Sequence, residues 1–327
     1  MPFRQTTVAG LPAVALFTDE AELITLPGAA GRITHLRRRA GREWLWRNRA
    51  LPFRAPPRDP GSSPTRYVDE FDSGGWDECF PTVGACPLPG AAPDAPWLPD
   101  HGELWSAVWR HDLSTGPTET VWRGAVRCST VPAEFTRVVT LDHGGDPGTA
   151  TIRFDYRLGA LADRPLPFLW SAHPLFGLTP GMQLELPGVA RVRVAAVHGR
   201  HDLTPGQEAD WPLDGGDRFT VPAPAGWAMK LFATVPAVAR ARLIDPRRGE
   251  TLELLWDGEV VPLVGLWLNM GGWSPRGDPY YNLAVEPCHG APDRLDQAVE
   301  DWGLAPFLRP GEERAWRLTV VLREGTR

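Results

Sequence analysis

Apolar and polar residues alternate along several short stretches of the chain. In "TIRFDYRL", residues 151–158, charged side chains separate the apolar ones at every second position from Ile152 to Leu158. In "AWRLTVVL", residues 315–322, apolar residues again recur with a period of two, beginning at Trp316. Successive side chains of a strand point to opposite faces, so this pattern predicts strands that bury one face and expose the other. Half-buried strands of this kind are typical of antiparallel sheets.

Seven more stretches have the composition of strands, and proline and glycine separate them. They are "ELITLP", "GRITHLRRR", "EFTRVVTLD", "VRVAAV", "WAMKLFATV", "ARARLID" and "TLELLW". Proline and glycine end regular structure, so each run is bounded as a strand should be. The chain is therefore predicted to be all-β, a large antiparallel β supersandwich with one or two short helices.

One segment has a helical pattern instead. In "APDRLDQAVEDWG", apolar residues are spaced by three to four positions from Leu295 to Trp302. Pro292 suits a first helical turn and Gly303 suits the position after the last one. We expect a short helix here that packs on the sheets.

The length of 327 residues fits one large β domain, because β folds of this size commonly form a single unit. Two stretches rich in proline and glycine, residues 51–65 and 86–99, are predicted to be long loops. Such loops serve as linkers or carry binding sites on a rigid scaffold. Nothing else marks a domain boundary at either loop, so we expect one domain over residues 1–327.

Charge and hydropathy exclude several classes of function. The net charge of −6 provides no basic surface for nucleic acid. No segment approaches the roughly 20 apolar residues of a membrane helix, and the N-terminus lacks the apolar core of a signal peptide. The four cysteines form no C-x-x-C pair and no zinc-like spacing. We therefore expect a cytoplasmic protein with free thiols, no metal site, and no nucleic-acid or membrane partner.

Five clusters combine ionisable residues with aromatics and glycines. They are "GGWDECFPTVG", "DHGELW", "FLWSAHPLFG", "LWLNMGGW" and "NLAVEPCHG". This mixture is expected where a sugar ring stacks on its apolar face and is hydrogen-bonded at its edge. The chain has 15 tryptophans, which agrees with sugar binding, although tryptophan is also ordinary β-core material.

Glu286 and His173 are the first candidates for chemistry, and each has a structural alternative. Glu286 ends an apolar run and precedes Pro287, whose ring restricts the backbone and would hold the carboxylate stiffly. A Glu before a proline is also a common way to end a strand. His173 follows the apolar "PFLWSA" and is either a functional group or a core histidine. His198 and His201, in "HGRH", are predicted to lie in a surface loop.

The motifs together carry a family resemblance. The strongest are "HGELW", "WSAHPLF", "LAVEPCHGAPDRLDQA" and "LRPGEERAWRLTVVL", and weaker ones are "GAAGRITHLRRRAGREWLW" and "GGWDECFPTVG". In these stretches, and in their order, the chain resembles the aldose 1-epimerases, the galactose mutarotase-like proteins, over most of its length.

The resemblance implies a cofactor-independent isomerase that interconverts the anomers of a free aldose. His173 would be the acid that protonates the ring oxygen, Glu286 the base that takes the proton of the C1 hydroxyl, and His101 a residue that orients the sugar. An imidazole with a pKa of about 6.5 suits proton transfer near neutrality. The partner is then a small sugar, and the protein a monomer or homodimer. Further residues expected on the sugar side are Arg66, Trp76, Asp77, Glu78, Lys230 and Trp267.

The sequence also departs from the family pattern. Galactose mutarotases have an Arg before the first His and an Asp between the second His and the Glu. Arg66 is a candidate for the first of these, but the region of the second, "GWAMKLFATV", offers only Lys230. Galactose is therefore not assumed to be the substrate. Asp77 and Glu78 are alternatively residues that brace a loop, and Lys230 would suit an acidic sugar.

Two other classes of function stay open. One is a sugar-binding protein of the same fold that has no turnover. The other is a glycoside hydrolase, which needs two carboxylates, and there Glu103 or Asp77 would partner Glu286. A zinc deaminase fits poorly, because the H-x-E at His101 lacks its P-C-x-x-C partner. Two carboxyls facing one pocket would favour hydrolysis, whereas a His facing Glu286 would favour mutarotation.

Overall fold

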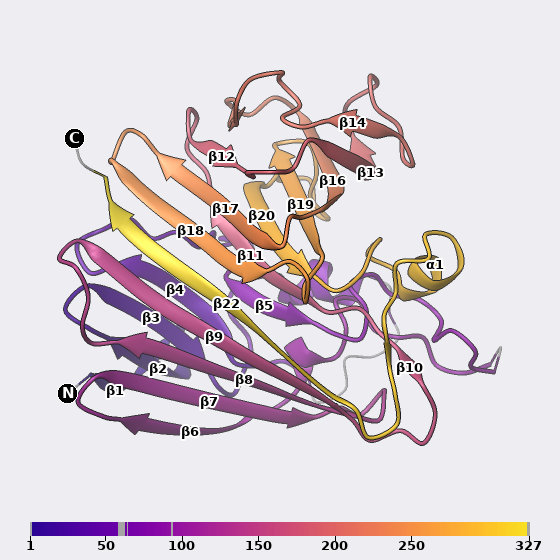
Figure 1. Cartoon of the computed structure of the whole chain (residues 1–327), viewed down its shortest axis with the longest axis horizontal. Helices are drawn as coiled ribbons and strands as arrows, with labels where there is room; N and C mark the ends of the chain where they lie inside the picture. The colour runs from indigo at the N-terminus through magenta and orange to yellow at the C-terminus, as the bar shows by residue number, and fades with distance from the viewer. Residues whose placement is uncertain (1, 58–62, 64, 93, 326–327) are drawn as a thin grey trace.

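Two large antiparallel sheets form most of the molecule (Figure 1). The computed structural model describes residues 2–57, 63, 65–92 and 94–325. Residues 58–62, 64 and 93, from the two predicted loops, lie outside the described residues. The all-β prediction is confirmed.

The first sheet has 11 strands. In spatial order they are β1 (Phe3–Val8), β2 (Leu11–Phe17), β3 (Ala21–Leu26), β4 (Arg32–Arg38), β5 (Trp76–Cys79), β11 (Ser171–Gly177), β20 (Tyr281–Cys288), β19 (Leu263–Met270), β16 (Trp227–Thr234), β13 (Arg191–His198) and β14 (Glu208–Asp210). The polar–aromatic clusters of the sequence supply the central strands β5, β11, β20 and β19.

The second sheet has nine strands. In order they are β15 (Phe219–Thr220), β12 (Gln183–Glu185), β17 (Val238–Asp245), β18 (Glu250–Asp257), β22 (Glu313–Glu324), β9 (Thr149–Ala160), β8 (Ala133–Asp142), β7 (Glu119–Arg127) and β6 (Arg110–Thr115). A separate pair joins β10 (Leu166–Pro167) and β21 (Phe307–Leu308). All nine predicted strand runs coincide with strands of the two sheets.

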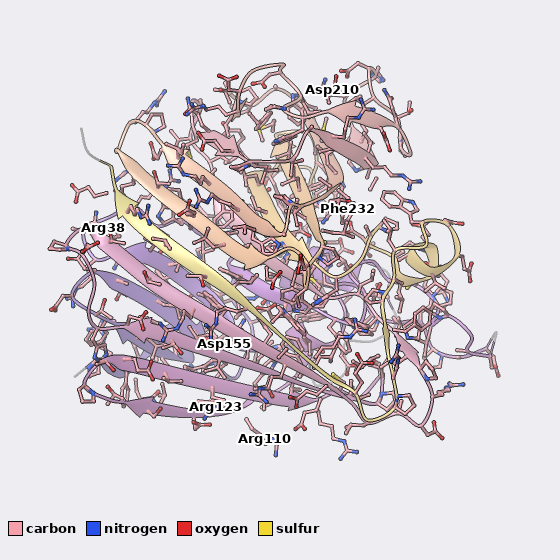
Figure 2. All side chains as sticks on the ribbon, viewed as in Figure 1. Arg38, Arg110, Arg123, Asp155, Asp210 and Phe232 are labelled. Carbon is pink, nitrogen blue, oxygen red and sulfur yellow. The ribbon has the colours of Figure 1, made fainter. Side chains whose placement is uncertain are left out.

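The alternating pattern of the second sheet divides the core from solvent. Ile152, Phe154 and Leu158 of β9 are fully buried, as their period of two predicted. Charged residues occupy the other face, where Arg123 and Asp155 lie on the outer side of the sheet (Figure 2). The apolar faces of the two sheets pack together, so that Trp76 of β5 stacks on Phe154 with ring centroids 4.6 Å apart.

The predicted helix is present but shorter than expected. Helix α1 (Leu295–Glu300) buries Leu295 and Ala298, and Gly303 after it has the positive φ of a helix stop. It begins three residues after Pro292, because Arg294 still has an extended backbone. Two shorter helical turns, Tyr67–Phe71 and Leu104–Ser106, complete the regular structure. Among the described residues, no helix is long and apolar enough to cross a membrane.

Candidate active site

Neighbouring strands of the first sheet place the candidate residues in rows across one face. On β11 and β20, Ser171 pairs with Cys288 and Leu175 pairs with Ala284, so the same register sets His173 opposite Glu286. Paired residues of antiparallel strands project on the same face. His173 and Glu286, 113 positions apart in the sequence, therefore project side by side.

Three rows follow from the register, each separated from the next by two residues along a strand. The first row comprises Asp77, His173, Glu286, Gly265 and Phe232. The second comprises Leu175, Ala284, Trp267, Lys230 and Ala196. The third comprises Gly177, Asn282, Asn269, Ala228 and His198.

A cavity of about 240 Å³ lies over these rows. Its lining residues are Val68, Asp72, Val83, Gly84, Asp100, His101, His173, Leu175, Ala196, His198, Lys230, Trp267, Trp273, Tyr280, Asn282, Glu286 and Asp293. Drug-sized ligands occupy sites of roughly 300–1,000 Å³, so this cavity suits a smaller molecule. It brings together five predicted residues: His101, His173, Lys230, Trp267 and Glu286.

Glu286 is almost fully buried and is held by one of its two oxygens. Its Oε2 accepts hydrogen bonds from Lys230 Nζ at 2.6 Å and from Ser171 Oγ at 3.3 Å. Its Oε1 has no hydrogen-bond partner among the described residues. One carboxylate oxygen is therefore fixed while the other remains unengaged.

Lys230 is also close to a second carboxylate. Its Nζ lies 3.1 Å from Asp293 Oδ1, and its side chain is 6% exposed. Burial alone would lower the pKa of Lys230, but Asp293 and Glu286 outweigh it and raise that pKa. Two carboxylates thus neutralise the one ammonium of the cavity, which removes the sequence-based reason to expect an acidic sugar.

His101 is positioned by a hydrogen bond to its neighbour Asp100. The Nδ1 of His101 lies 2.8 Å from Asp100 Oδ1, and His101 has a φ of 58°, which is uncommon outside glycine. Gly102 follows with a φ of 69°, and a Cβ there would lie 2.1 Å from the carbonyl oxygen of Phe80. The H-G motif is therefore a tight turn that only glycine can complete.

The two imidazoles of the cavity have opposite electrostatic environments. Burial lowers the pKa of His101, but Asp100, Asp72 and Asp293 outweigh burial and raise it above the usual value. Burial holds the pKa of His173 well below the usual value, and His101 and Lys230 lower it further. The surroundings therefore favour a proton on His101 and disfavour one on His173.

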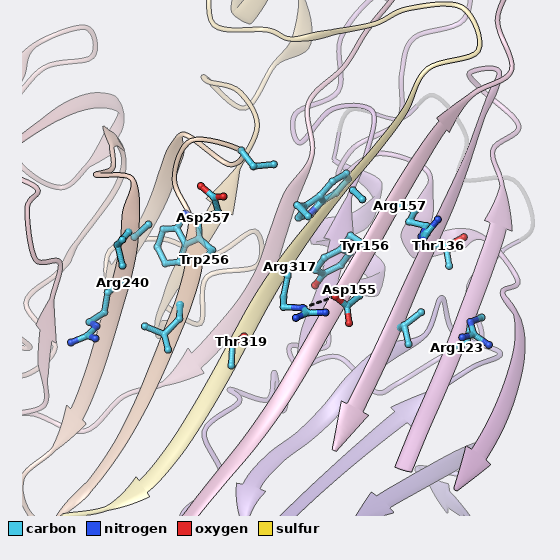
Figure 3. A pocket seen from close by; sticks show the side chains of 17 residues that line it. Arg123, Thr136, Asp155, Tyr156, Arg157, Arg240, Trp256, Asp257, Arg317 and Thr319 are labelled. Atoms are coloured by element: carbon cyan, nitrogen blue, oxygen red, sulfur yellow. Dashed lines mark hydrogen bonds and ion pairs between the residues drawn. The ribbon is translucent and has the colours of Figure 1, made fainter. Parts of the chain in front are cut away.

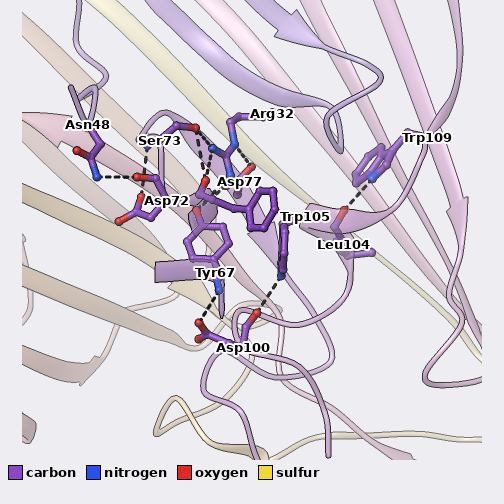
Figure 4. Close-up of polar contacts among 12 residues, drawn as sticks. Arg32, Asn48, Tyr67, Asp72, Ser73, Asp77, Asp100, Leu104, Trp105 and Trp109 are labelled. Atoms are coloured by element: carbon purple, nitrogen blue, oxygen red, sulfur yellow. Dashed lines mark hydrogen bonds and ion pairs between the residues drawn. The ribbon is translucent and has the colours of Figure 1, made fainter. Parts of the chain in front are cut away.

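Asp77 faces the same side as His173 but is engaged by Arg32 and Tyr67 (Figure 4). Its Oδ1 accepts from Arg32 Nε at 2.9 Å, and its Oδ2 accepts from the Tyr67 hydroxyl at 2.6 Å. The Arg32 ion pair is buried on both sides. Asp77 therefore has the bracing role that was one of its two predicted alternatives, and it does not line the cavity.

Trp76 and Glu78 lie in the core rather than in the cavity, which corrects the expectation that they contact sugar. They flank Asp77 on β5 and so project from the opposite face of the sheet. Glu78 forms a buried ion pair with Arg137 at 3.0 Å and also accepts from the Tyr156 hydroxyl and the Trp170 indole.

Arg66 is half-buried beside Phe71, with its guanidinium carbon 5.9 Å from the ring centroid, and is not among the lining residues. His201 is exposed, as expected for a surface loop. His198 is also exposed, but it ends β13 instead of lying in a loop, and it lines the cavity beside Trp267 and Trp273.

Several lining residues were not found from the sequence. Asp72 follows the helical turn Tyr67–Phe71, and Asp100 lies in a turn. Asp293 precedes α1, and Asn282 stands four residues before Glu286. A period of two places Asn282 on the same face as Glu286, so the strand pattern contained this signal. Both polar atoms of the Asn282 amide are buried without a partner among the described residues.

Neither carboxylate that was predicted to partner Glu286 in a hydrolase lines the cavity, although Asp72, Asp100 and Asp293 do line it. Glu103 accepts hydrogen bonds from Ser129 and Thr130, which connect it to a loop, and it does not line the cavity. Asp77 is bound to Arg32. The group opposite Glu286 is instead the imidazole of His173.

A larger hollow of about 1,090 Å³ lies on the outer face of the second sheet (Figure 3). Arg317 and Asp155, which line it, pair with each other at 2.6 Å. Arg157 is paired with Glu313 and Arg240 with Glu253. The Arg157 and Arg317 pairs are exposed ion pairs, which contribute little individually, and none of the predicted catalytic residues lines this hollow.

Searches for related proteins give structural similarity alone. No family model matches the chain, and no curated protein sequence matches it. A galactose mutarotase-like protein from Lactobacillus casei superposes with a TM-score of 0.64 at 19% identity, over 95% of this chain and 100% of that one. A galactose mutarotase related enzyme from Lactobacillus acidophilus gives 0.64 at 14% identity, over 96% and 98%.

A galactose mutarotase-like protein from Clostridium acetobutylicum gives a TM-score of 0.66 at 10% identity, over 98% of both chains. The chain has the galactose mutarotase-like fold. Other structures that superpose on this chain carry the name aldose 1-epimerase. Among the described residues, no three His, Cys, Asp or Glu side chains form a metal-binding group.

Proposed function

We propose that the protein is an aldose 1-epimerase that opens and closes the ring of a free aldose without a cofactor. The observation that carries this proposal is the register that sets His173 opposite Glu286 over one cavity, with His101 beside them. The His101 and His173 rings lie 5.0 Å apart between centroids. An imidazole acid and a carboxylate base thus share the site, as anomer exchange requires.

Glu286 takes the proton of the C1 hydroxyl through Oε1, since Oε2 is held by Lys230 and Ser171. An imidazole proton passes to the ring oxygen as the C1–O5 bond breaks and the C1 aldehyde forms. Rotation about C1–C2 and reversal of both proton transfers give the other anomer. Leu175 and Trp267 of the second row offer an apolar surface for the ring between these groups and Asn282.

A pure sugar-binding protein is the second candidate, and the buried Glu286 argues against it. Burying a carboxylate beside an ammonium costs desolvation energy, which binding alone does not require. A carboxylate and an imidazole on facing strands are what proton transfer needs.

The test is anomeric exchange measured by NMR on a panel of freshly dissolved aldoses with the purified protein. We expect faster exchange for at least one uncharged aldose, and no such acceleration for its 6-phosphate. We also expect the rate to survive exhaustive EDTA treatment, because the proposed steps use side-chain protons only. Binding of a sugar without exchange would establish the binding protein instead.

A further inference from the structure

We propose that the Asp100–His101 pair is the proton source of the cavity, so that His101 protonates the ring oxygen and His173 stays neutral and hydrogen-bonds the sugar. This inference rests on the proposed function and deepens it. It departs from the resemblance, which gives the acid role to His173.

The first support is the way Asp100 is fixed. Its Oδ2 accepts from the backbone N–H groups of Tyr67 at 3.0 Å and Val68 at 3.3 Å, and its Oδ1 faces His101 Nδ1 at 2.8 Å. Its backbone carbonyl accepts from the Trp105 indole at 2.8 Å (Figure 4). A carboxylate held in this way orients an imidazole and stabilises its charged form.

The second support is the fixed plane of the His101 ring. Tyr67 stacks on it with centroids 4.1 Å apart and an interplanar angle of 19°. The Tyr67 hydroxyl is itself anchored on Asp77. With Nδ1 directed at Asp100, the second proton of the imidazolium is on Nε2, the nitrogen that can donate to a ligand.

The third support is the distribution of charge around the two rings. Asp100, Asp72 and Asp293 all favour a proton on His101. His173 faces His101 on one side and Lys230 on another, and its cross-strand partner Asp77 is already paired with Arg32. Two like charges at this separation disfavour each other, so one proton shared by the pair resides on His101.

The proton transfers balance without another reactant. As the C1–O5 bond breaks, O5 takes the Nε2 proton of His101 and keeps the electron pair of that bond. Glu286 Oε1 takes the O1 proton, and the O1–H electron pair becomes the second bond of the aldehyde. Ring closure on the other face returns both protons, so the neutral His101 and protonated Glu286 exist only while the sugar is open.

The test compares pH profiles of anomeric exchange for the wild type, His101→Asn and His173→Asn. The wild-type rate should fall at alkaline pH as His101 loses its proton. His101→Asn should abolish this alkaline decrease and lower the rate by about 10²–10⁴-fold. His173→Asn should retain the alkaline decrease. The exposed His201→Asn is the control, with an unchanged profile. If the alkaline decrease survives in His101→Asn and disappears in His173→Asn, the proposal is overturned.

A second measurement does not depend on turnover. NMR titration of the imidazole signals of the wild-type protein, assigned with the same two variants, should show His101 titrating above the usual value and His173 not titrating near neutrality. Asp100→Asn should move the His101 midpoint down. The reverse order of the two midpoints overturns the inference even if exchange is observed, whereas the absence of exchange on every aldose tells against the proposed function alone.

Discussion

Glu286→Gln isolates the base of the proposed reaction. The Gln carbonyl can take the place of Oε2 and keep the contacts with Lys230 and Ser171, while its NH₂ group takes the place of Oε1, which has no partner to lose. The side chain keeps its shape but can no longer accept a proton. We expect turnover to fall by about 10²–10⁴-fold, equivalent to about 3–5 kcal/mol in the barrier.

The fold should tolerate this change, because Lys230 retains Asp293 at 3.1 Å. Even if one of the contacts with Lys230 or Ser171 were lost, the unfolding free energy should fall by only about 1.5–3 kcal/mol. Sugar affinity, followed by the fluorescence of the cavity residues Trp267 and Trp273, should stay within a few-fold of the wild type. Turnover is measured by anomeric exchange and stability by urea unfolding.

Ser171→Ala is the matched control, since it removes the longer contact to the same carboxylate oxygen without touching proton transfer. It should keep turnover within a few-fold. If Glu286→Gln retains turnover within ten-fold of the wild type, another residue is the base and the reasoning from the His173–Glu286 register is refuted.

Three further predictions follow from buried groups. Burial lowers the pKa of His289 to about 3, whereas the unfolded value is about 6.5, so unfolding takes up a proton between these values and acid destabilises the fold. The wild type should lose about 2 kcal/mol of unfolding free energy through His289 between pH 6.5 and 5, and His289→Phe should not lose this part, as measured by urea titrations. If both proteins lose the same amount, His289 is not the group that takes up the proton. Lys230→Met should lower the unfolding free energy by about 3–5 kcal/mol, because it leaves two carboxylates uncompensated. The double variant Lys230→Met with Asp293→Asn should recover part of this unfolding free energy. If the single and double variants lose the same amount, the Asp293 contact is unimportant. Asn282→Leu should stabilise the empty protein by about 1–3 kcal/mol, because it removes an unpartnered buried amide, and should weaken sugar binding measured by calorimetry; unaltered affinity would place the sugar away from Asn282.

The strands were predictable because their outer faces are polar. On β9 and in the middle of β22, buried residues alternate with half-buried or exposed ones, so the period of two is visible in the sequence. β5, β11 and β20 are covered on both faces, and their sequences have no such contrast. The alternation around Asp77 showed that Trp76 and Glu78 share a face, but not which face looks into the core.

The residues of the cavity were predictable where they lie on strands or in recognisable motifs. His173 and Glu286 belong to motifs whose order along the chain suggested one site. Asp100 and Asp293 lie outside strands, where periodicity carries no information. Their places depend on a turn with positive φ and on the path of the chain into α1, and both are set by contacts between distant segments.

The three rows separate two tasks that many active sites combine. Glu286, the proposed base, stands in the first row, and the amide of Asn282 stands in the third, about 14 Å further along β20 at roughly 3.4 Å per residue. The second row, which is apolar except for Lys230, lies between them. Because the Asn282 amide has no hydrogen-bond partner among the described residues and stands two rows from Glu286, changes in the third row can alter which sugar is accepted while the reaction centre is preserved. Relatives with this layout should therefore diversify in substrate by exchanging residues at the Asn282 and His198 positions, and directed evolution of a new specificity should begin there.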